Sequence, residues 1–227
     1  MDNVIKTTQK PLQLWLEKIF RTINSHIKVI RLEVFVTYLL FFILSLVLVS
    51  IYNKSDLHLT LNKYHTGFFD WFFKYSTHLG DGAMFGVLVV IFFFINKRMS
   101  LVFGIGGLLT LLFTHFFKKI IFKGIPRPAE FLGVENLHII DGVKMAFWNS
   151  FPSGHTMTAF AIFAILCIYF RRCVSQYLWI TLAMIAGMSR VYLSQHFLLD
   201  IFVGSILGIV IAFISMSLFF PERKRVH

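Results

Sequence analysis

Charged residues are scarce in this chain. Only 15% of its 227 residues are Asp, Glu, Lys or Arg, whereas 57% are hydrophobic. A soluble globular domain has about 25% charged and about 45–50% apolar residues, so the composition argues against a water-soluble protein. Acidic residues are the scarcest, with 11 against 22 basic ones and a formal net charge of +11. Such an excess suits nucleic acid or anionic lipid. The apolar background favours lipid, and we expect no nucleic-acid partner.

Cysteine is nearly absent as well. Cys167 and Cys173 are the only two, and they lack the spacing of a zinc site or a disulfide framework, so we expect both to be reduced. The chain also lacks internal repeats and low-complexity linkers, which indicates one domain. Its first thirty residues are basic and amphipathic. They do not show the short apolar core and small-residue cleavage site of a signal peptide.

Long apolar segments are abundant. A helix of about 20 apolar residues spans the hydrocarbon core of a bilayer, and several segments approach this length. We therefore predict an all-α integral membrane bundle of six transmembrane helices. They cover Val34–Tyr52, Gly67–Ile95, Leu101–Phe122, Gly154–Phe170, Tyr177–Leu193 and Phe197–Phe220. Four ionisable residues punctuate the first half of the second segment, which we expect in the interface or against the protein interior.

Residues 10–32 have a different character, because apolar side chains recur there at helical spacing with basic residues on the other faces. This pattern predicts an amphipathic helix on an anionic membrane surface; a helix packed on the domain is the alternative. The predicted organisation is an N-terminal amphipathic segment (1–32), a six-helix membrane domain (33–220) and a basic tail (221–227).

Three polar clusters interrupt the apolar segments. They are Lys119 with Arg127-Pro128, then Pro152-Ser153-Gly154-His155, then Ser189-Arg190 with His196 and Asp200. Ionisable groups beside a membrane span are costly to keep, and they mark functional sites by default.

The distribution of basic residues predicts the orientation. Cytoplasmic loops carry an excess of Lys and Arg. With the N-terminus inside, most basic residues outside the three clusters fall on the cytoplasmic side, so we expect both termini there. All three polar clusters then lie at the extracytoplasmic face, where they can form one site.

The third cluster contains a candidate nucleophile. His196 and Asp200 are four residues apart at a helix start, so both lie on one helix face. A carboxylate bonded to one ring nitrogen fixes the tautomer and leaves the other nitrogen free to attack. The alternative is a polar pair that only caps the helix.

The second cluster can bind an anion. Ser153 is a plausible helix N-cap, Gly154 lets a ligand approach the backbone, and a helix N-terminus attracts anions. His155 could then protonate a departing oxygen. Arg127, Arg190 and Lys119 would supply positive charge for phosphate oxygens. We interpret Lys118 and Lys123 as lysines that snorkel at the end of a span.

These motifs resemble those of the type 2 phosphatidic acid phosphatases, a family that includes bacterial lipid phosphatases. The family pattern is Lys, six residues, Arg-Pro; then Pro-Ser-Gly-His; then Ser-Arg, five residues, His, three residues, Asp. The second and third motifs match completely. In the first, seven residues separate Lys119 from Arg127, and we expect the loop at Gly124–Pro126 to absorb the extra one.

The resemblance implies a role for each residue. His196 would take the phosphoryl group as a phosphohistidine, Asp200 would orient it, and His155 would serve as acid and then base. The residues that would hold the phosphoryl oxygens are Lys119, Arg127, Ser153, Gly154 and Arg190. No metal and no other cofactor is expected.

The expected substrate is a lipid phosphate at the outer face of a bacterial inner membrane. Candidates are undecaprenyl pyrophosphate, phosphatidylglycerol phosphate, phosphatidic acid and lipid A. The segment Pro128–Phe151 is expected to help choose among them through Glu130, Glu135, His138, Asp141 and Lys144. A phosphotransferase on the same scaffold is one alternative, and a non-catalytic lipid-binding or transport protein is another.

Overall fold

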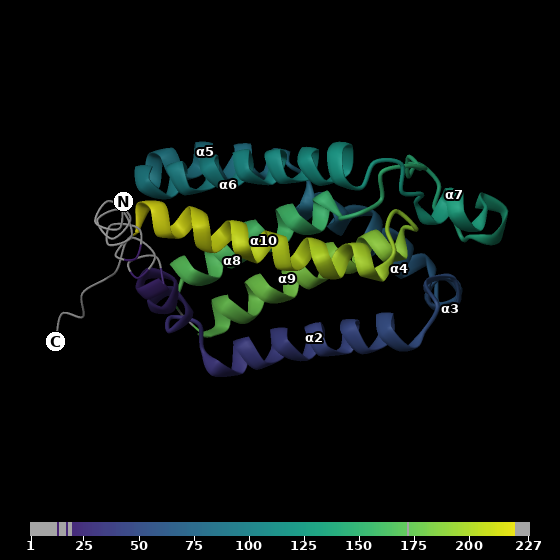
Figure 1. Cartoon of the computed structure of the whole chain (residues 1–227), viewed down its shortest axis with the longest axis horizontal. Helices are drawn as coiled ribbons and strands as arrows, with labels where there is room; N and C mark the ends of the chain where they lie inside the picture. The colour runs from purple at the N-terminus through teal and green to yellow at the C-terminus, as the bar shows by residue number, and fades with distance from the viewer. Residues whose placement is uncertain (1–12, 14–16, 18–19, 172, 221–227) are drawn as a thin grey trace, which may run out of the picture.

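The protein folds into a bundle of helices (Figure 1). The structure is a computed structural model that describes residues 13, 17, 20–171 and 173–220. Within this part of the chain the only β contact is an isolated bridge between Pro126 and Trp148. The helices are α2 (Leu32–Ile51), α3 (Lys54–Lys63), α4 (Gly67–Ser76), η1 (Thr77–Gly80), α5 (Ala83–Ile95), α6 (Lys97–Phe116), η2 (Phe117–Ile121), α7 (Pro128–Leu132), η3 (Val134–Asn136), α8 (Gly154–Tyr169), α9 (Cys173–Tyr192) and α10 (Leu198–Phe219).

Long apolar helices make this an integral membrane protein. In the described residues, three helices are long and apolar enough to cross a bilayer: α2, α6 together with η2, and α10. The bent pair of α4–η1 and α5 makes a fourth if it counts as one span. α8 is also apolar but shorter. The all-helical fold is therefore confirmed. Six helical segments lie where six spans were predicted, and the number of spans stays a prediction.

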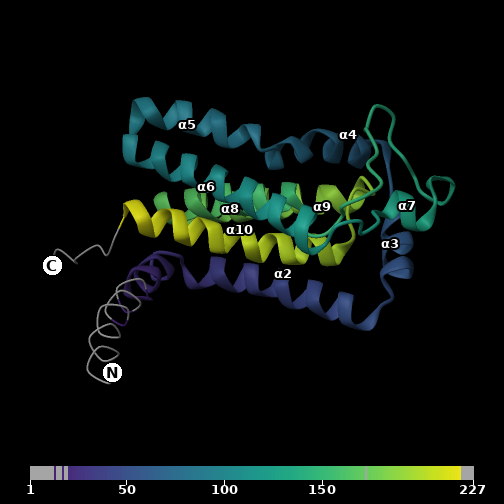
Figure 2. The same ribbon diagram turned by 45° about the horizontal axis from the view of Figure 1, so that its top comes forward.

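The arrangement places α8 at the centre of the bundle. Most of its residues are buried, and it packs against α6, α9, α10 and η1. The hairpin of α5 and α6 lies on one side of this core and α2 on the other (Figures 1 and 2). The outward faces of α2, α5 and α6 carry large exposed apolar side chains such as Leu40, Phe94 and Leu112, as expected for surfaces that face lipid.

The two ends of the bundle differ. α3 and α7 lie at one end, which we call the α3–α7 end (Figure 1). α2 begins and α10 finishes at the opposite end (Figure 2). α6 finishes, α8 begins, α9 finishes and α10 begins at the α3–α7 end. The three polar clusters therefore meet at one end of the bundle.

Glycines bring α8 and α10 unusually close. A Cβ atom on Gly204 would lie 2.7 Å from the carbonyl oxygen of Ser153, and one on Gly208 would lie 2.5 Å from that of Met157. Small residues allow this approach of two helix backbones. The contact fixes the start of α8 beside the first turns of α10, and those two helix starts carry the second and third polar clusters.

The second predicted span is not one straight helix. The axes of Gly67–Gly80 and Ala83–Ile95 differ by 61°, with the break at Asp81 and Gly82. The expectation that the first half lies in the interface or against the protein interior stays a prediction. The break turns η1 toward the start of α8.

The predicted N-terminal amphipathic helix is described only in part. Residues 20–27 are helical, whereas most residues before them lie outside the described part of the chain, as does the tail 221–227. The interfacial position of this segment and the role of the tail remain predictions.

Candidate active site

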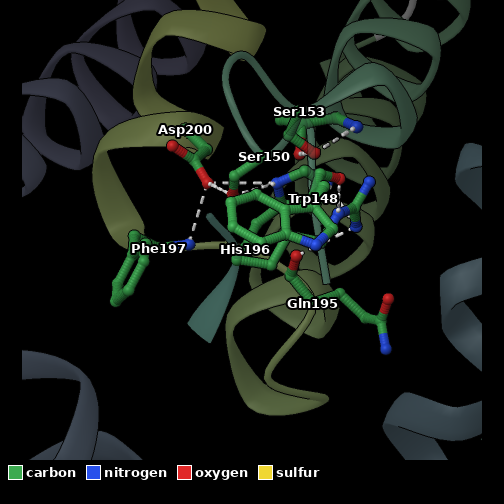
Figure 3. A network of polar contacts seen from close by, with 9 residues as sticks. Trp148, Ser150, Ser153, Gln195, His196, Phe197 and Asp200 are labelled. Atoms are coloured by element: carbon green, nitrogen blue, oxygen red, sulfur yellow. Dashed lines mark hydrogen bonds and ion pairs between the residues drawn. The ribbon is translucent and has the colours of Figure 1, made fainter. Parts of the chain in front are cut away.

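The start of α10 positions His196 and Asp200. Asp200 is the third residue of the helix, and its Oδ2 accepts the backbone N–H of Phe197 at 3.0 Å, which satisfies one of the free donors of a helix N-terminus. The same oxygen lies 3.1 Å from Nδ1 of His196 and accepts the hydroxyl of Ser150 at 2.5 Å (Figure 3). His196 is 1% exposed and Asp200 4%. The pair is therefore buried and held in one orientation.

The partners of His196 determine its tautomer. Asp200 as a carboxylate only accepts, so Nδ1 of His196 must carry the proton. Its Nε2 lies 3.3 Å from Nη1 of Arg127, and a guanidinium only donates. Nε2 therefore holds a lone pair, as a nucleophile requires.

Arg127 is positioned by a short pairing of two chain segments. The backbone N–H of Arg127 donates to the carbonyl of Phe147 at 2.7 Å, and that of Ser150 donates to the carbonyl of Ile125 at 3.0 Å. The guanidinium then donates from Nε to the carbonyl of Trp148 and from Nη1 to that of Gln195, both at 3.0 Å. These contacts hold its charge against His196.

Arg190 lies near the end of α9 and is only 8% exposed. Its Nη1 donates to the hydroxyl of Thr77 at 2.7 Å. Its Nε is buried without a hydrogen-bond partner among the described residues. A buried, unpaired donor on a cation is costly, and it suits a site that an anion completes.

The N-terminus of α8 carries Ser153, Gly154 and His155. The hydroxyl of Ser153 accepts the backbone N–H of Thr156 at 3.4 Å, so its expected position as helix N-cap is confirmed. Ser153 is fully buried, and Gly154 presents the helix start to the space beside it. The ring of His155 lies with its Nε2 2.8 Å from Oδ1 of Asp81.

The structure brings Lys118, rather than Lys119, to this site. Lys118 lines the central pocket, whereas Lys119 is exposed and does not line it. The reason is a π-helical turn over Phe117–Ile121, closed by a hydrogen bond from the N–H of Phe122 to the carbonyl of Phe117 at 2.7 Å. A π turn holds one residue more than an α turn and so rotates the side chains that it contains. Eight residues separate Lys118 from Arg127, two more than in the family pattern, and the π turn accommodates one of them within the helix.

These side chains surround one pocket of about 650 Å³. Its polar part is lined by Lys118, Arg127, Gly154, His155, Arg190 and His196. It continues along α5 and α6, where Phe85, Gly107 and Leu111 make the lining more apolar. Asp200 stands behind His196, and Ser153 lies behind the start of α8, so neither lines the pocket.

The comparisons with known proteins agree with this geometry. Residues 99–224 match the model of the PAP2 superfamily. The chain belongs to the PAP2 superfamily. This superfamily is that of the type 2 phosphatidic acid phosphatases, whose motifs the sequence resembles. The chain is therefore a membrane protein of a lipid phosphatase family.

Individual PAP2 proteins of known structure are similar over most of their length. LpxE of Aquifex aeolicus is 27% identical, with a TM-score of 0.61 over 71% of this chain and 93% of that one. A PAP2 type phosphatidylglycerolphosphate phosphatase from Bacillus subtilis is 23% identical, with a TM-score of 0.61 over 81% and 94%. The second likeness shows the fold alone.

A curated relative is similar over a shorter stretch. The bacitracin transport permease protein BcrC of Bacillus licheniformis is 36% identical over 64 residues, which make up 28% of this chain. The matched stretch spans 30% of the length of that relative.

In this PAP2 protein the pocket environment keeps His196 neutral. Burial lowers the pKa of His196 well below its ordinary value of 6.5, and the positive charges of Lys118, Arg127 and Arg190 lower it further. Burial likewise lowers the pKa of Arg127. A neutral imidazole with a free Nε2 is the form that attacks an electrophile.

Several site residues carry no motif in the sequence. Ser150 donates a hydrogen bond to Asp200, and the carboxylate of Asp81 pairs with His155. The sequence pattern of Lys118 predicts only a lysine that snorkels at the end of a span. Ser150 precedes the Pro-Ser-Gly-His motif by one residue, and Asp81 stood out only as a polar residue in an apolar segment. The bend between η1 and α5 brings Asp81 to the site, and the π turn brings Lys118 there. Within the described residues, no group of three or more His, Cys, Asp or Glu is arranged to hold a metal ion.

Proposed function

We propose that this PAP2 protein hydrolyses a phosphomonoester or pyrophosphate of a lipid at the extracytoplasmic face, through a phosphohistidine at His196 and without a metal. The observation that carries the proposal is the unprotonated Nε2 of His196, which faces a pocket whose walls carry Arg127, Arg190 and Lys118. Phosphoryl transfer needs chiefly positioning and charge stabilisation, and this pocket supplies both.

In the first step Nε2 of His196 attacks the phosphorus atom of the lipid phosphate. The N–P bond forms as the P–O bond to the leaving group breaks, and His155 gives its proton to the departing oxygen. His196 becomes positively charged during the attack, and the carboxylate of Asp200, 3.1 Å from Nδ1, stabilises that charge.

In the second step water attacks the phosphorus atom from the side on which the lipid has left. His155, now neutral, takes a proton from the water. The N–P bond breaks, inorganic phosphate forms, and His196 regains its lone pair. One histidine thus acts first as acid and then as base, as the two half-reactions require.

Positive side chains would hold the phosphoryl oxygens in both steps. We assign this role to Arg127, Arg190 and Lys118, with the backbone of Gly154 at the start of α8. Lys118 replaces Lys119 in this assignment because it lines the pocket. Ser153 contributes indirectly, as the cap that shapes the helix start. Each such group is worth about 10²–10³ in rate when aimed at developing charge.

The substrate is proposed to be a lipid because the polar pocket continues into a more apolar groove along α5 and α6. The relatives point to the same class: a phosphatidylglycerolphosphate phosphatase shares the fold. Undecaprenyl pyrophosphate, phosphatidylglycerol phosphate, phosphatidic acid and lipid A are the four candidates.

The orientation is part of the proposal. The polar lining of the pocket comes from the start of α8, the end of α9 and the residues just before α10. These lie at the α3–α7 end, whereas α2 begins and α10 finishes at the other end (Figures 1 and 2). Lys97, Arg98 and Arg171 stand at helix junctions of that other end, which basic residues mark as cytoplasmic. The pocket would then face the periplasm from a bacterial inner membrane, with residues 1–32 on the inner surface and 221–227 as a cytoplasmic tail.

The test is release of inorganic phosphate by the purified full chain from each of the four lipids in detergent micelles. We expect release from at least one lipid, with His196→Ala reducing the rate by about 10³-fold or more. We expect the rate to be unchanged in EDTA, and a ³²P-labelled lipid to leave label on the wild type but not on His196→Ala.

Other outcomes would contradict the proposal. Release that requires a second lipid acceptor would favour phosphotransfer, and loss of activity in EDTA would require a metal. A folded wild-type protein that releases no phosphate from any of the four lipids would exclude hydrolysis and leave lipid binding or transport.

A further inference from the structure

A carboxylate outside the family motifs bonds the proposed acid–base histidine. Oδ1 of Asp81 lies 2.8 Å from Nε2 of His155, and Oδ2 of the same carboxylate lies 2.7 Å from Nδ1 of His78. The side chain of Asp81 is 39% exposed, that of His155 35% and that of His78 67%. His78 therefore faces outward, and Asp81 stands between it and the pocket.

The bend in the second apolar segment builds this contact. Asp81 occupies the break between η1 and α5. Gly80, just before it, is buried against the start of α8, where an added Cβ atom would lie only 2.7 Å from the carbonyl oxygen of His155. Only glycine permits this approach. The backbone of η1 is thus held against α8 at the one place from which residue 81 reaches the imidazole.

We propose that Asp81 is a positioning residue for His155: it holds the Nε2–H of the imidazole, so that the ring exchanges its catalytic proton at Nδ1. The proposal rests on the proposed hydrolase function. In the protonated ring, Nε2–H donates to Asp81 and Nδ1–H donates to the departing lipid oxygen. After that transfer Nε2–H still donates to Asp81, and the free Nδ1 takes the proton from the attacking water.

The charges around His155 explain why a carboxylate is needed there. Lys118 from η2 and Arg190 from α9 face the ring from the pocket, and His196 lies across it. The positive charges of Lys118 and Arg190, which line the same pocket, oppose a positive charge on the imidazole of His155. Asp81 opposes them, with His78 on its outer side. Without the carboxylate, His155 would lose both its orientation and much of its capacity to carry a proton.

Leaving-group dependence separates this role from a structural one. Dioctanoyl phosphatidic acid releases an alkoxide, which needs a proton from the general acid. p-Nitrophenyl phosphate releases a phenolate, which leaves with little assistance. A fold defect lowers both rates equally, because it removes active molecules. Loss of acid catalysis lowers the alkyl rate far more than the aryl rate.

The experiment measures, in a single turnover, the rate at which each substrate releases its alcohol or phenol, because this rate reports the first step alone. It compares the wild type with Asp81→Asn, the smaller neutral variant Asp81→Ser, and Asp81→Glu. We expect Asp81→Asn and Asp81→Ser to lower this rate for phosphatidic acid by about 10²-fold and for p-nitrophenyl phosphate by less than about 3-fold. Asp81→Glu keeps the carboxylate and should recover part of the alkyl rate. The alkaline limb of the alkyl pH profile should move to lower pH in Asp81→Asn, because a neighbouring carboxylate favours the protonated ring.

Asp70→Asn is the matched control. Asp70 also accepts a hydrogen bond from a histidine, with its Oδ2 3.0 Å from Nε2 of His138, and it lies on the same predicted span but outside the pocket. We expect this variant to keep the wild-type ratio of alkyl to aryl rates.

The results separate the inference from the function on which it rests. If the wild type releases phosphate but Asp81→Asn loses both rates equally, or shows the ratio of Asp70→Asn, the inference is overturned and the hydrolase stands. If the wild type releases phosphate from neither substrate, both are overturned. If Asp81→Asn lowers activity further in a His155→Ala background with p-nitrophenyl phosphate, Asp81 does not act through His155, and the inference is again overturned.

Discussion

At the scale of single residues, the site depends on one histidine kept neutral and oriented inside a cluster of cations. His196 donates from Nδ1 to Asp200 and offers Nε2 to the pocket, while Arg127 stands 3.3 Å from that nitrogen. The same cations that would bind phosphate also disfavour protonation of the nucleophile. One electrostatic arrangement therefore serves both binding and attack.

This arrangement predicts a pH dependence of stability. The unfolded chain protonates His196 near 6.5, whereas the pKa of the folded group lies well below that value because of burial and the neighbouring cations. The unfolded state binds more protons as the pH falls below 6.5. The contribution of His196 to stability is therefore complete above pH 6.5 and decreases below it, by roughly 1.4 kcal/mol per pH unit.

Thermal unfolding in detergent between pH 8 and pH 5 checks this prediction. A His196→Gln variant lacks the titrating group, so its stability relative to the wild type should improve as the pH falls. Parallel pH profiles for the two proteins would contradict the depressed pKa.

The two neighbouring lysines give a second residue-scale prediction. Lys118 lines the pocket and Lys119 is exposed. We expect Lys118→Ala to lower kcat/KM for phosphate release by about 10²-fold, the value of one charge-stabilising group, and Lys119→Ala to lower it by less than about 3-fold, since exposed charges contribute little. Phosphate release by the two purified variants measures both effects. A larger loss with Lys119→Ala than with Lys118→Ala would mean that Lys119 binds the phosphoryl oxygens.

At the scale of helices, the site depends on how closely α10 and η1 approach α8. Gly204 and Gly208 let α10 lie against α8, and Gly80 does the same for η1. These contacts set the distance between the helix start that carries His155 and the one that carries Asp200. The backbone N–H of Ser153 donates to the carbonyl of Asp200 at 3.1 Å, which joins the two starts directly.

Substitution of one glycine tests this dependence. In Gly204→Ala the added Cβ atom would lie 2.7 Å from the carbonyl oxygen of Ser153, and backbone cannot move aside as a flexible side chain can. We expect a loss of about 1–3 kcal/mol in stability, with reduced phosphate release because the two helix starts separate.

Gly86→Ala is the matched control. Gly86 lies within α5, and no atom within 4 Å would meet its Cβ atom. Alanine favours a helix by about 0.8–1 kcal/mol over glycine, so this variant should be as stable as the wild type or slightly more so. Equal effects of the two substitutions on the unfolding temperature would show that close packing at Gly204 is not the cause.

At the scale of the whole molecule, the connections between helices separate the pocket from the junctions that carry basic residues. The pocket at the α3–α7 end is lined by Lys118, Arg127 and Arg190, whereas Lys97, Arg98 and Arg171 stand at the other end. This asymmetry underlies the proposed orientation, with the pocket outward and the termini inward.

Labelling with a membrane-impermeant maleimide in intact cells tests the orientation. In a background with Cys167→Ala and Cys173→Ala, we expect Val134→Cys to be labelled from outside, because Val134 is 42% exposed beyond α7. We expect Arg98→Cys, at the start of α6, to be labelled only after the membrane is opened. The reverse pattern would place the pocket in the cytoplasm.

Much of the fold could be predicted from the sequence because hydrocarbon imposes a strong constraint. Apolar runs predicted the positions of the six helical segments, since an exposed backbone cannot persist in lipid. The break at Asp81 was indicated only indirectly, by ionisable residues that are costly in hydrocarbon. At this break η1 packs against the start of α8, and no local pattern encodes a contact between segments so far apart in the chain.

The sequence by itself determined the class of protein and the motif residues from Arg127 to Asp200, because those depend on composition and on short spacings along one chain. Only the tertiary structure decided which lysine reaches the pocket and which carboxylate bonds His155. A π turn rotates Lys118 inward, and the glycine contact at Gly80 brings Asp81 to a helix more than seventy residues away. Both depend on helix geometry and on the approach of backbones distant in the chain, and spacing in the sequence does not specify either.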